Sequence, residues 1–294
     1  MKALTNLWVL ALAAFTTLSC TKQEDTSTLI LPRLSMAKLA AVAAATKPAP
    51  YDVLHLGSNW KLSVPIDVDG GNTGTATTIS NSKLADGYNS DYFYTLDSPY
   101  TDVVRLWCPV NGATTSPGSG SDHPRVELNE LTNWYTKNQS GISDEIIGGR
   151  MDVVLSVRQF SATGDVIIGQ IHGTGTPAGS YPFVMLHASN DSIVAVVKGD
   201  TVGNTGTKKY TLLRNVTLGA KITFSIVDST NGHIYFTASS TGATGKGSWS
   251  TAVPANWKTV LVRFQVGNYL QDHDLSAVST SGSKVNLYSL KVTH

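Results

Sequence analysis

From residue 51 onward, short apolar runs alternate with breaks rich in Gly, Asn, Ser, Thr and Asp. The runs are rich in Val, Ile, Tyr, Phe and Thr, and many of their apolar positions recur at every second residue. That period is typical of β-strands with one buried face. The pattern predicts strands at Trp60–Pro65, Tyr92–Leu96, Val103–Cys108, His123–Leu131, Met151–Phe160, Asp165–His172, Pro182–Ala188, Ser192–Lys198, Lys208–Leu213, Ala220–Val227, His233–Ser239, Thr259–Val266 and Lys284–Val292.

Helical periodicity is weak in this part of the chain. It predicts only single turns, near Asn81–Asp86 and near Trp134–Asn138. A succession of strands without intervening helices implies antiparallel sheets that bury one face against each other. We therefore predict an all-β fold, a jelly-roll β-sandwich of two antiparallel sheets in which the outer face of one sheet curves into a concave groove that binds substrate.

The first 50 residues have a different composition. A basic start, an apolar run from Leu7 to Phe15 and small residues up to Cys20 are typical of a secretory signal. Cys20 resembles the lipidated cysteine of bacterial lipoproteins, although Thr17 replaces the usual aliphatic residue. We predict a signal peptide at 1–20, a disordered tether at 21–50 and one folded domain at 51–294.

This organisation predicts an exported protein. Lipidation at Cys20 would make it an outer-membrane lipoprotein, held to the membrane by its lipid and facing the cell surface or the periplasm. Without lipidation it would be secreted. We expect a monomer.

Charge and cysteine content narrow the function further. The 294 residues carry a net charge of +1, so no overall field favours a nucleic acid. The chain has two cysteines, and lipidation of Cys20 would leave Cys108 as a buried small hydrophobe without a disulfide partner. No cysteine and histidine spacing matches a zinc site. We expect neither a metal nor a cofactor.

Polar residues recur at every second position in three of the segments, opposite apolar positions such as Val126, Ile171 and Phe264. These polar residues are Arg125, Glu127 and Asn129; Gln170 and His172; and Arg263, Gln265 and Tyr269. Singly, each set also fits a solvated strand face, and Arg125 with Glu127 fits a surface ion pair. Glu127 is the only carboxylate among them, and Glu130 is expected to point inward or to lie at the strand end. Glycosidases need two facing carboxyl groups, so hydrolysis is disfavoured.

The three segments together resemble the signature regions of the alginate lyases of polysaccharide lyase family 7. Those regions are Arg-[Ser/Thr]-Glu-Leu-Arg, Gln-[Ile/Val]-His and Tyr-x-Lys-Ala-Gly-x-Tyr-x-Gln. The chain has Arg125-Val-Glu-Leu-Asn129, Gln170-Ile-His172 and Arg263-Phe-Gln-Val-Gly-Asn-Tyr-Leu-Gln271 in the same order. Asn59–Pro65 and Pro109–Thr115 also resemble flanking segments of these enzymes.

The resemblance implies a jelly roll that binds an anionic polyuronate and cleaves its 4-O-glycosidic bond by β-elimination, without a metal. By matched position, Tyr269 is the expected acid and an alternative base for one epimer, whereas His172 is the expected base or carboxylate partner. Gln170 and Arg125 are expected to neutralise the substrate carboxylate. Glu127 would orient Arg125, and Asn129, Arg263, Gln265 and Gln271 would contact substrate.

The chain departs from the family pattern at charged positions. Asn129 replaces an arginine, Gln265 replaces a lysine, and Arg263 stands where a tyrosine is common. We hypothesise that Arg263 partly replaces the lost charge. The departures leave another polyuronate, such as glucuronan, as an alternative substrate. A non-catalytic carbohydrate-binding β-sandwich and a concanavalin-like glycoside hydrolase are the alternatives from other functional classes.

Overall fold

The computed structural model describes residues 47–117, 121–136, 145–175 and 181–294. The predicted signal peptide, Cys20 and nearly all of the predicted tether lie outside these residues. The helical elements are α2 (Pro50–Leu54), α3 (Asn81–Ala85) and the 3-10 turn η2 (Ala255–Trp257). Among the described helices, none has the length and hydrophobicity needed to cross a membrane.

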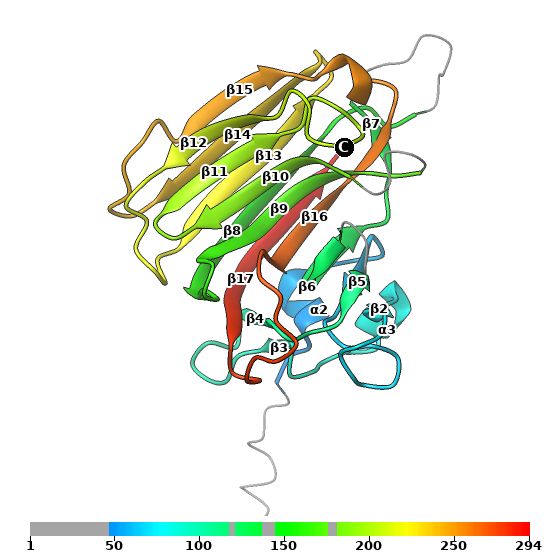
Figure 1. The fold of residues 1–294 in the computed structure, drawn as a ribbon, viewed down its shortest axis with the longest axis vertical. Coiled ribbons are helices and arrows are strands. Elements are labelled where there is room, and N and C mark those ends of the chain that lie inside the picture. The colour runs from blue at the N-terminus through cyan, green and yellow to red at the C-terminus, as the bar shows by residue number, and fades with distance from the viewer. Residues whose placement is uncertain (1–46, 118–120, 137–144, 176–180) are drawn as a thin grey trace, which may run out of the picture. The chain divides into compact units, whose positions relative to one another are not determined.

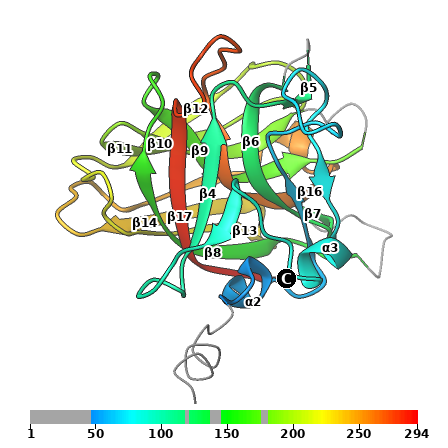
Figure 2. The ribbon, with the colours of Figure 1, turned by 90° about the horizontal axis from the view of Figure 1, so that it is seen from below.

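Two antiparallel sheets make up the described residues (Figures 1 and 2). The ten-stranded sheet has β12 (Lys208–Leu213), β11 (Ser192–Val197), β10 (Pro182–Ser189), β9 (Asp165–Gly173), β16 (Leu261–Leu270), β6 (Ser121–Glu130), β1 (Trp60–Ser63) and β2 (Thr78–Ile79) in spatial order, with β5 (Thr114–Ser116) beside β6 and β7 (Trp134–Tyr135) beside β16. The seven-stranded sheet has β15 (Ser248–Ala252), β14 (His233–Ser240), β13 (Ile222–Ser229), β8 (Gly149–Gln159), β17 (Gly282–Thr293), β4 (Val104–Pro109) and β3 (Phe93–Thr95). The predicted β-sandwich of two antiparallel sheets is confirmed.

The hydrophobic core lies between the sheets. Val126 and Leu128 of β6, Ile171 of β9 and Phe264 of β16 have no exposed surface. Burial of such a side chain contributes about 1.5–3 kcal/mol to the free energy of unfolding. Cys108 is also fully buried and is a free thiol, as predicted. Because alternate residues of a strand face opposite sides, the polar residues between these apolar ones lie on the other side of the ten-stranded sheet, here called the outer face.

The prediction of a helical turn near Trp134–Asn138 is wrong for the residues of this segment that the structure describes. Trp134 and Tyr135 form β7, which pairs with Val262 and Leu261 of β16. Trp134 has no exposed surface and its ring lies 4.9 Å from that of Phe264, so packing and strand pairing override a weak local preference. Residues 137 and 138 lie outside the described part of the chain.

The other comparisons between predicted and observed structure concern short helices and strands. The helix predicted near Asn81 is confirmed as α3, whose first turn is capped by Ser80, because the Ser80 hydroxyl accepts a hydrogen bond from the Lys83 amide. Helix α2 begins at Pro50, and it lies with α3 at one end of the sandwich (Figure 1). Strands β2, β5 and β15 were not predicted, because two to five residues carry little periodicity.

Candidate active site

Strands β6, β16 and β9 are neighbours in the ten-stranded sheet and bring the three polar segments together. Arg125 pairs with Tyr269, and Gln265 pairs with Gln170. Arg263 pairs with His172, which completes the same neighbourhood. The polar residues that the sequence placed on one face of each strand therefore form one continuous patch on the outer face.

An irregularity in the sheet positions Tyr269. Between Val266 and Tyr269, β16 has one more residue than the facing part of β9, which is a β-bulge. Gly267 lies in this bulge, where a Cβ atom would come within 2.3 Å of the Val126 carbonyl oxygen. Only glycine allows β16 to approach β6 this closely. Asn268, next to it, points inward and donates hydrogen bonds to the Leu106 and Ser283 carbonyls of the opposite sheet.

A chain of hydrogen-bonded side chains forms the floor of the patch. Gln170 Nε2 donates to Glu127 Oε1 at 2.5 Å and to Gln265 Oε1 at 3.0 Å. Gln265 Nε2 donates to Asn129 Oδ1 at 2.7 Å, and Asn129 Nδ2 donates to Ser63 Oγ at 3.3 Å. Each of these five side chains is at most 7% exposed. They lie beneath partly exposed neighbours and hold one another in fixed orientations.

The two departures from the family pattern on this floor are coupled. Asn129 and Gln265 face each other across β6 and β16 and are hydrogen-bonded to each other. Two cations in these positions would lie side by side and repel each other, whereas two amides pair. The second proton of Asn129 Nδ2 goes to the Glu127 carbonyl, so its amide group is fully engaged within the protein. Gln265 accepts a hydrogen bond from Gln170, and Asn129 in turn holds the Gln265 amide.

Arg125 lies between Glu127 and Tyr269. Its Nη1 donates to Glu127 Oε2 at 3.1 Å, and its guanidinium carbon lies 3.6 Å from the centre of the Tyr269 ring. Both partners of the ion pair are almost completely buried. The stack and the ion pair fix the guanidinium on one side of the tyrosine.

His172 is held in one tautomer. Its Nδ1 lies 2.9 Å from the Gly173 carbonyl oxygen, which can only accept, so Nδ1 carries the proton and Nε2 keeps its lone pair. Burial, with smaller contributions from Arg263, Arg125 and Lys198, lowers the pKa of His172 to about 4. The imidazole is therefore neutral at pH 7, with a nitrogen ready to accept a proton.

The amide of Gln170 presents its oxygen, not its nitrogen. Both protons of Nε2 go to Glu127 and Gln265, and Oε1 is buried without a hydrogen-bond partner among the described residues. The sequence suggested a donor to a carboxylate at this position. The geometry instead offers an acceptor, which suits a protonated carboxyl or a hydroxyl group.

The remaining predicted residues lie around this centre. Arg263 is partly exposed beside His172. Gln271 follows the end of β16, and its Nε2 donates to the Leu270 carbonyl at 2.6 Å. Glu130 points inward, as expected, and accepts hydrogen bonds from the Phe264 amide and from His294. Across the described residues, no group of three or more His, Cys, Asp or Glu side chains could hold a metal ion.

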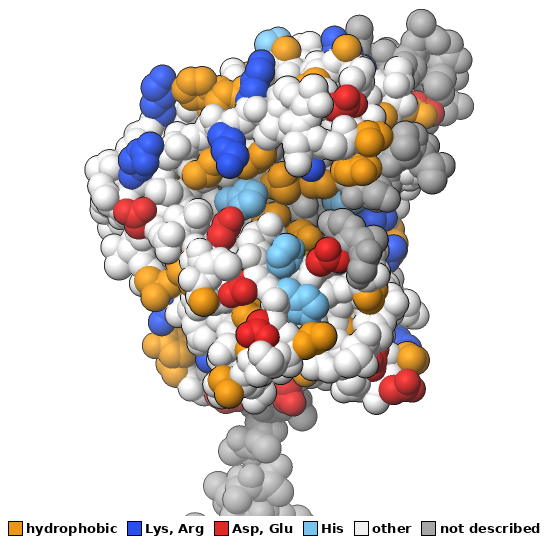
Figure 3. Space-filling view, viewed as in Figure 1, with side chains coloured by type: hydrophobic (Ala, Val, Ile, Leu, Met, Phe, Trp, Pro, Cys, Tyr) orange, Lys and Arg blue, Asp and Glu red, His pale blue; other side chains and the backbone are white. Residues whose placement is uncertain are grey.

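Three further residues of the outer face were not predicted. Lys61 of β1 aligns with Asn129, and the His123 ring meets the Tyr269 ring edge-on at 6.4 Å. His187 of β10 lies 3.0 Å from Asp165 and faces Ile167, which in turn faces Tyr269. In Figure 3, histidine and acidic side chains gather across the middle of the visible face. Period-two spacing would have identified Lys61, whereas the His187 pairing depends on a bulge that no local signal shows.

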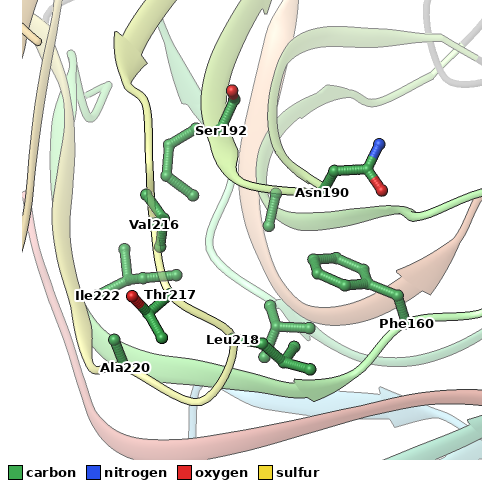
Figure 4. Close-up of a pocket in the computed structure, with 11 residues that line it drawn as sticks. Phe160, Asn190, Ser192, Val216, Thr217, Leu218, Ala220 and Ile222 are labelled. Carbon is green, nitrogen blue, oxygen red and sulfur yellow. The ribbon is translucent and has the colours of Figure 1, made fainter. Parts of the chain in front are cut away.

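The small pocket in Figure 4 lies apart from this patch. Phe160, Val216 and Ile222 line it together with Asn190 and other residues, and its volume of about 10 Å³ leaves room for no more than a water molecule. A wider hollow of about 320 Å³, lined by Tyr92 and Trp107 among others, also shares no residue with the patch. Neither hollow contains the four predicted catalytic side chains.

Comparison with known proteins gives a consistent result. The family model described as alginate lyase matches residues 54–294. The alginate lyase PA1167 from Pseudomonas aeruginosa superimposes with a TM-score of 0.65 and 29% identity, covering 81% of this chain and 98% of that chain. The alginate lyase A1-II′, a member of polysaccharide lyase family 7, gives 0.64 and 27%, covering 84% and 98%.

A third solved structure is so different in sequence that its similarity concerns the fold alone. The alginate lyase from Klebsiella pneumoniae has a TM-score of 0.67 at 22% identity, covering 84% of this chain and 99% of that chain. The search of curated proteins finds no match.

Proposed function

Because the chain belongs to the alginate lyase family, we propose that it is a polysaccharide lyase that cleaves alginate by β-elimination at the site formed by Arg125, Gln170, His172 and Tyr269. β-Elimination breaks the 4-O-glycosidic bond without water and leaves an unsaturated sugar at the new non-reducing end. The single observation that supports these roles is the convergence of the four side chains from β6, β9 and β16 on one outer face.

The first requirement is to acidify the C5 proton of the uronate. That proton is weakly acidic while the adjacent carboxylate is charged, because the enolate-like intermediate gathers further negative charge on the same group. Arg125 supplies a positive charge held in place by Glu127. The Gln170 oxygen accepts a hydrogen bond from the protonated carboxyl group, which stabilises its neutral form.

The proton transfers fall to His172 and Tyr269. His172 Nε2 takes the C5 proton, the C5–H electron pair forms the C4–C5 double bond, and the C4–O4 bond breaks. The Tyr269 hydroxyl gives its proton to the leaving oxygen. Bound carboxylates offset the field of Arg263, Arg125 and Lys198, so substrate binding makes His172 a stronger base.

Complexes of a relative support this division of roles. A1-II′ was crystallised with the product GGG after one tyrosine was changed to phenylalanine, and with the substrate GGMG after a histidine was also changed to asparagine. The two residue types altered there are those to which we assign proton transfer here.

Glucuronan remains the alternative substrate, favoured by the neutral Asn129–Gln265 pair in place of two cations. A non-catalytic carbohydrate-binding module is the alternative from another class, but binding alone requires no neutral imidazole with a free nitrogen. To separate these functions, we would incubate the protein with alginate, polyguluronate, polymannuronate and glucuronan and follow the ultraviolet absorbance of the unsaturated product. Binding without a rise in absorbance on any polymer would support the module.

We also propose that the protein is exported as a monomer and anchored through a lipid on Cys20, which supports action on extracellular polymer. Detergent partitioning of wild type and Cys20→Ser tests the anchor, since the variant should move to the aqueous phase. Light scattering of the purified protein tests the oligomeric state.

A further inference from the structure

Two cations on the outer face have no partner among the residues that the structure describes. Lys61 of β1 and Arg263 of β16 are both partly exposed. Within the described residues, no carboxylate forms an ion pair with either side chain and no acceptor forms a hydrogen bond with either one. The Nε atom of Arg263 is buried and without a hydrogen-bond partner among these residues.

Sheet geometry places the two side chains on either side of the end of β6. Lys61 aligns with Asn129, which aligns with Gln265, and Arg263 lies two residues from Gln265 along β16. The Cα atoms of Lys61 and Arg263 are separated by two inter-strand spacings and by two residues along a strand, which puts them about 12 Å apart. Two long side chains that share one face can together bracket a small anion across such a gap.

The positive charge of Arg263 is felt at Lys61. Burial lowers the pKa of Lys61, and the charge of Arg263 lowers it further. Burial also lowers the pKa of Arg263, while Glu127 and Glu130 act in the opposite direction from a distance. Both carboxylates already have partners, Arg125 and Gln170 for Glu127 and His294 for Glu130. A half-buried pair of like charges that no carboxylate of the described residues pairs with is a site for an external anion.

The neighbouring cations Arg125 and Lys198, unlike Lys61 and Arg263, have partners within the protein. Arg125 is bound to Glu127, and Lys198 donates to the Gly203 carbonyl and lies over the Tyr181 ring. The floor between Lys61 and Gln170 is neutral, because Asn129 and Gln265 are paired amides. The two cations that lack a partner among the described residues therefore lie on opposite sides of this floor. Arg263 lies beside His172, and Lys61 lies beside Asn129 on β1.

We propose that Lys61 and Arg263 together bind one carboxylate of the polyuronate, at a sugar next to the one whose C5 proton His172 removes. This subsite rests on the proposed function. Arg263 faces His172 directly across β16 and β9, so a carboxylate gripped here belongs to a neighbouring sugar and not to the reacting one. The site would recognise a carboxylate rather than a hydroxyl, because both donors on this face carry a positive charge.

The test uses binding, so that it does not depend on turnover. In a Tyr269→Phe background, which keeps substrate intact, we would measure by calorimetry the Kd of a uronate tetrasaccharide and of its carboxyl-reduced, neutral counterpart. Arg263→Gln and Lys61→Gln are each expected to weaken binding of the charged form about tenfold and to leave binding of the neutral form unchanged. The double variant should lose less than the product of the single losses, because both residues hold one carboxylate.

Lys291→Gln is the matched control, since Lys291 is exposed on β17 of the other sheet, and it should bind like the parent. Unchanged affinity in both single variants, or equal losses for charged and neutral sugars, would overturn the subsite. A wild-type protein that binds the charged sugar through these residues but forms no unsaturated product would instead overturn the lyase function and leave the subsite standing.

Discussion

The Gln170 side chain directs its Nε2 at Glu127, 2.5 Å from Oε1, and leaves its own Oε1 buried without a hydrogen-bond partner among the described residues. Glu127 therefore does two things at once. It holds the Arg125 guanidinium, and it decides which end of the Gln170 amide is offered to substrate.

Glu127→Gln tests this dual role with little change in shape. The new amide can neither hold Arg125 by charge nor enforce the orientation of Gln170, so kcat should fall about 10- to 100-fold. The expected loss is measured by steady-state kinetics, with circular dichroism to confirm the fold.

Asp152→Asn is the matched control. Arg150 and Asp152 form the same i, i+2 ion pair on β8 of the other sheet, and activity should not change when it is broken. A Glu127→Gln protein as active as this control would show that Glu127 plays no part in catalysis.

Tyr269→Phe removes one hydroxyl and keeps the ring on which Arg125 stacks. Loss of the general acid should lower kcat about 10²- to 10⁴-fold while the melting temperature stays within a few degrees. Tyr235→Phe, at an exposed tyrosine of β14, serves as control and should leave kcat unchanged. Retention of a third or more of the activity by Tyr269→Phe would rule out its role as acid.

The pH dependence of kcat/KM reports the free enzyme. Because the pKa of His172 is lowered to about 4, the neutral, basic form persists well below pH 6. The acidic limb of the profile should therefore lie closer to pH 4 than to the ordinary histidine value of about 6.5. A limb centred near 6.5, measured with a polymer whose own carboxylates remain ionised, would mean that another histidine is the base.

Much of the fold could be predicted because alternation is a local signal. Val126 and Leu128 alternate with Glu127 and Asn129, and β6 follows directly from that pattern. The pairing of β16 with β6 on one side and with β9 on the other has no such signal, since it joins segments that lie far apart in the chain, and only the family resemblance suggested it. Trp134 was assigned to a helix because two residues of β7 are too few to show a period.

The site could be predicted as a set of residue types but not as an arrangement. The orientation of the Gln170 amide depends on hydrogen bonds to two other strands. The pairing of Asn129 with Gln265 depends on their register, which turns two apparent losses of charge into one neutral contact. His187 and Asp165 meet only because β9 carries an extra residue opposite β10.

Asp228 offers a test of the core rather than of catalysis. It is 2% exposed on β13, and neither carboxylate oxygen has a hydrogen-bond partner among the described residues. Burial raises its pKa to about 9, whereas the unfolded chain ionises near pH 4. The folded protein therefore holds a proton that the unfolded chain releases, and the free energy of unfolding falls as pH rises from about 4 to 9.

Asp228→Asn removes the ionisation with little change in shape. The variant should gain roughly 2 kcal/mol in unfolding free energy at pH 8 and little at pH 4.5. Urea denaturation at the two pH values measures the difference. An equal effect at both would show that Asp228 does not carry the extra proton.

Elimination on the outer face is the reaction proposed for this protein. Mass spectrometry of the products formed from alginate by the purified protein tests it most directly. We expect oligosaccharides that lack the water added by hydrolysis and carry a C4–C5 double bond, formed by wild type and lost in Tyr269→Phe. Saturated products, or unsaturated products formed equally by both proteins, would contradict it.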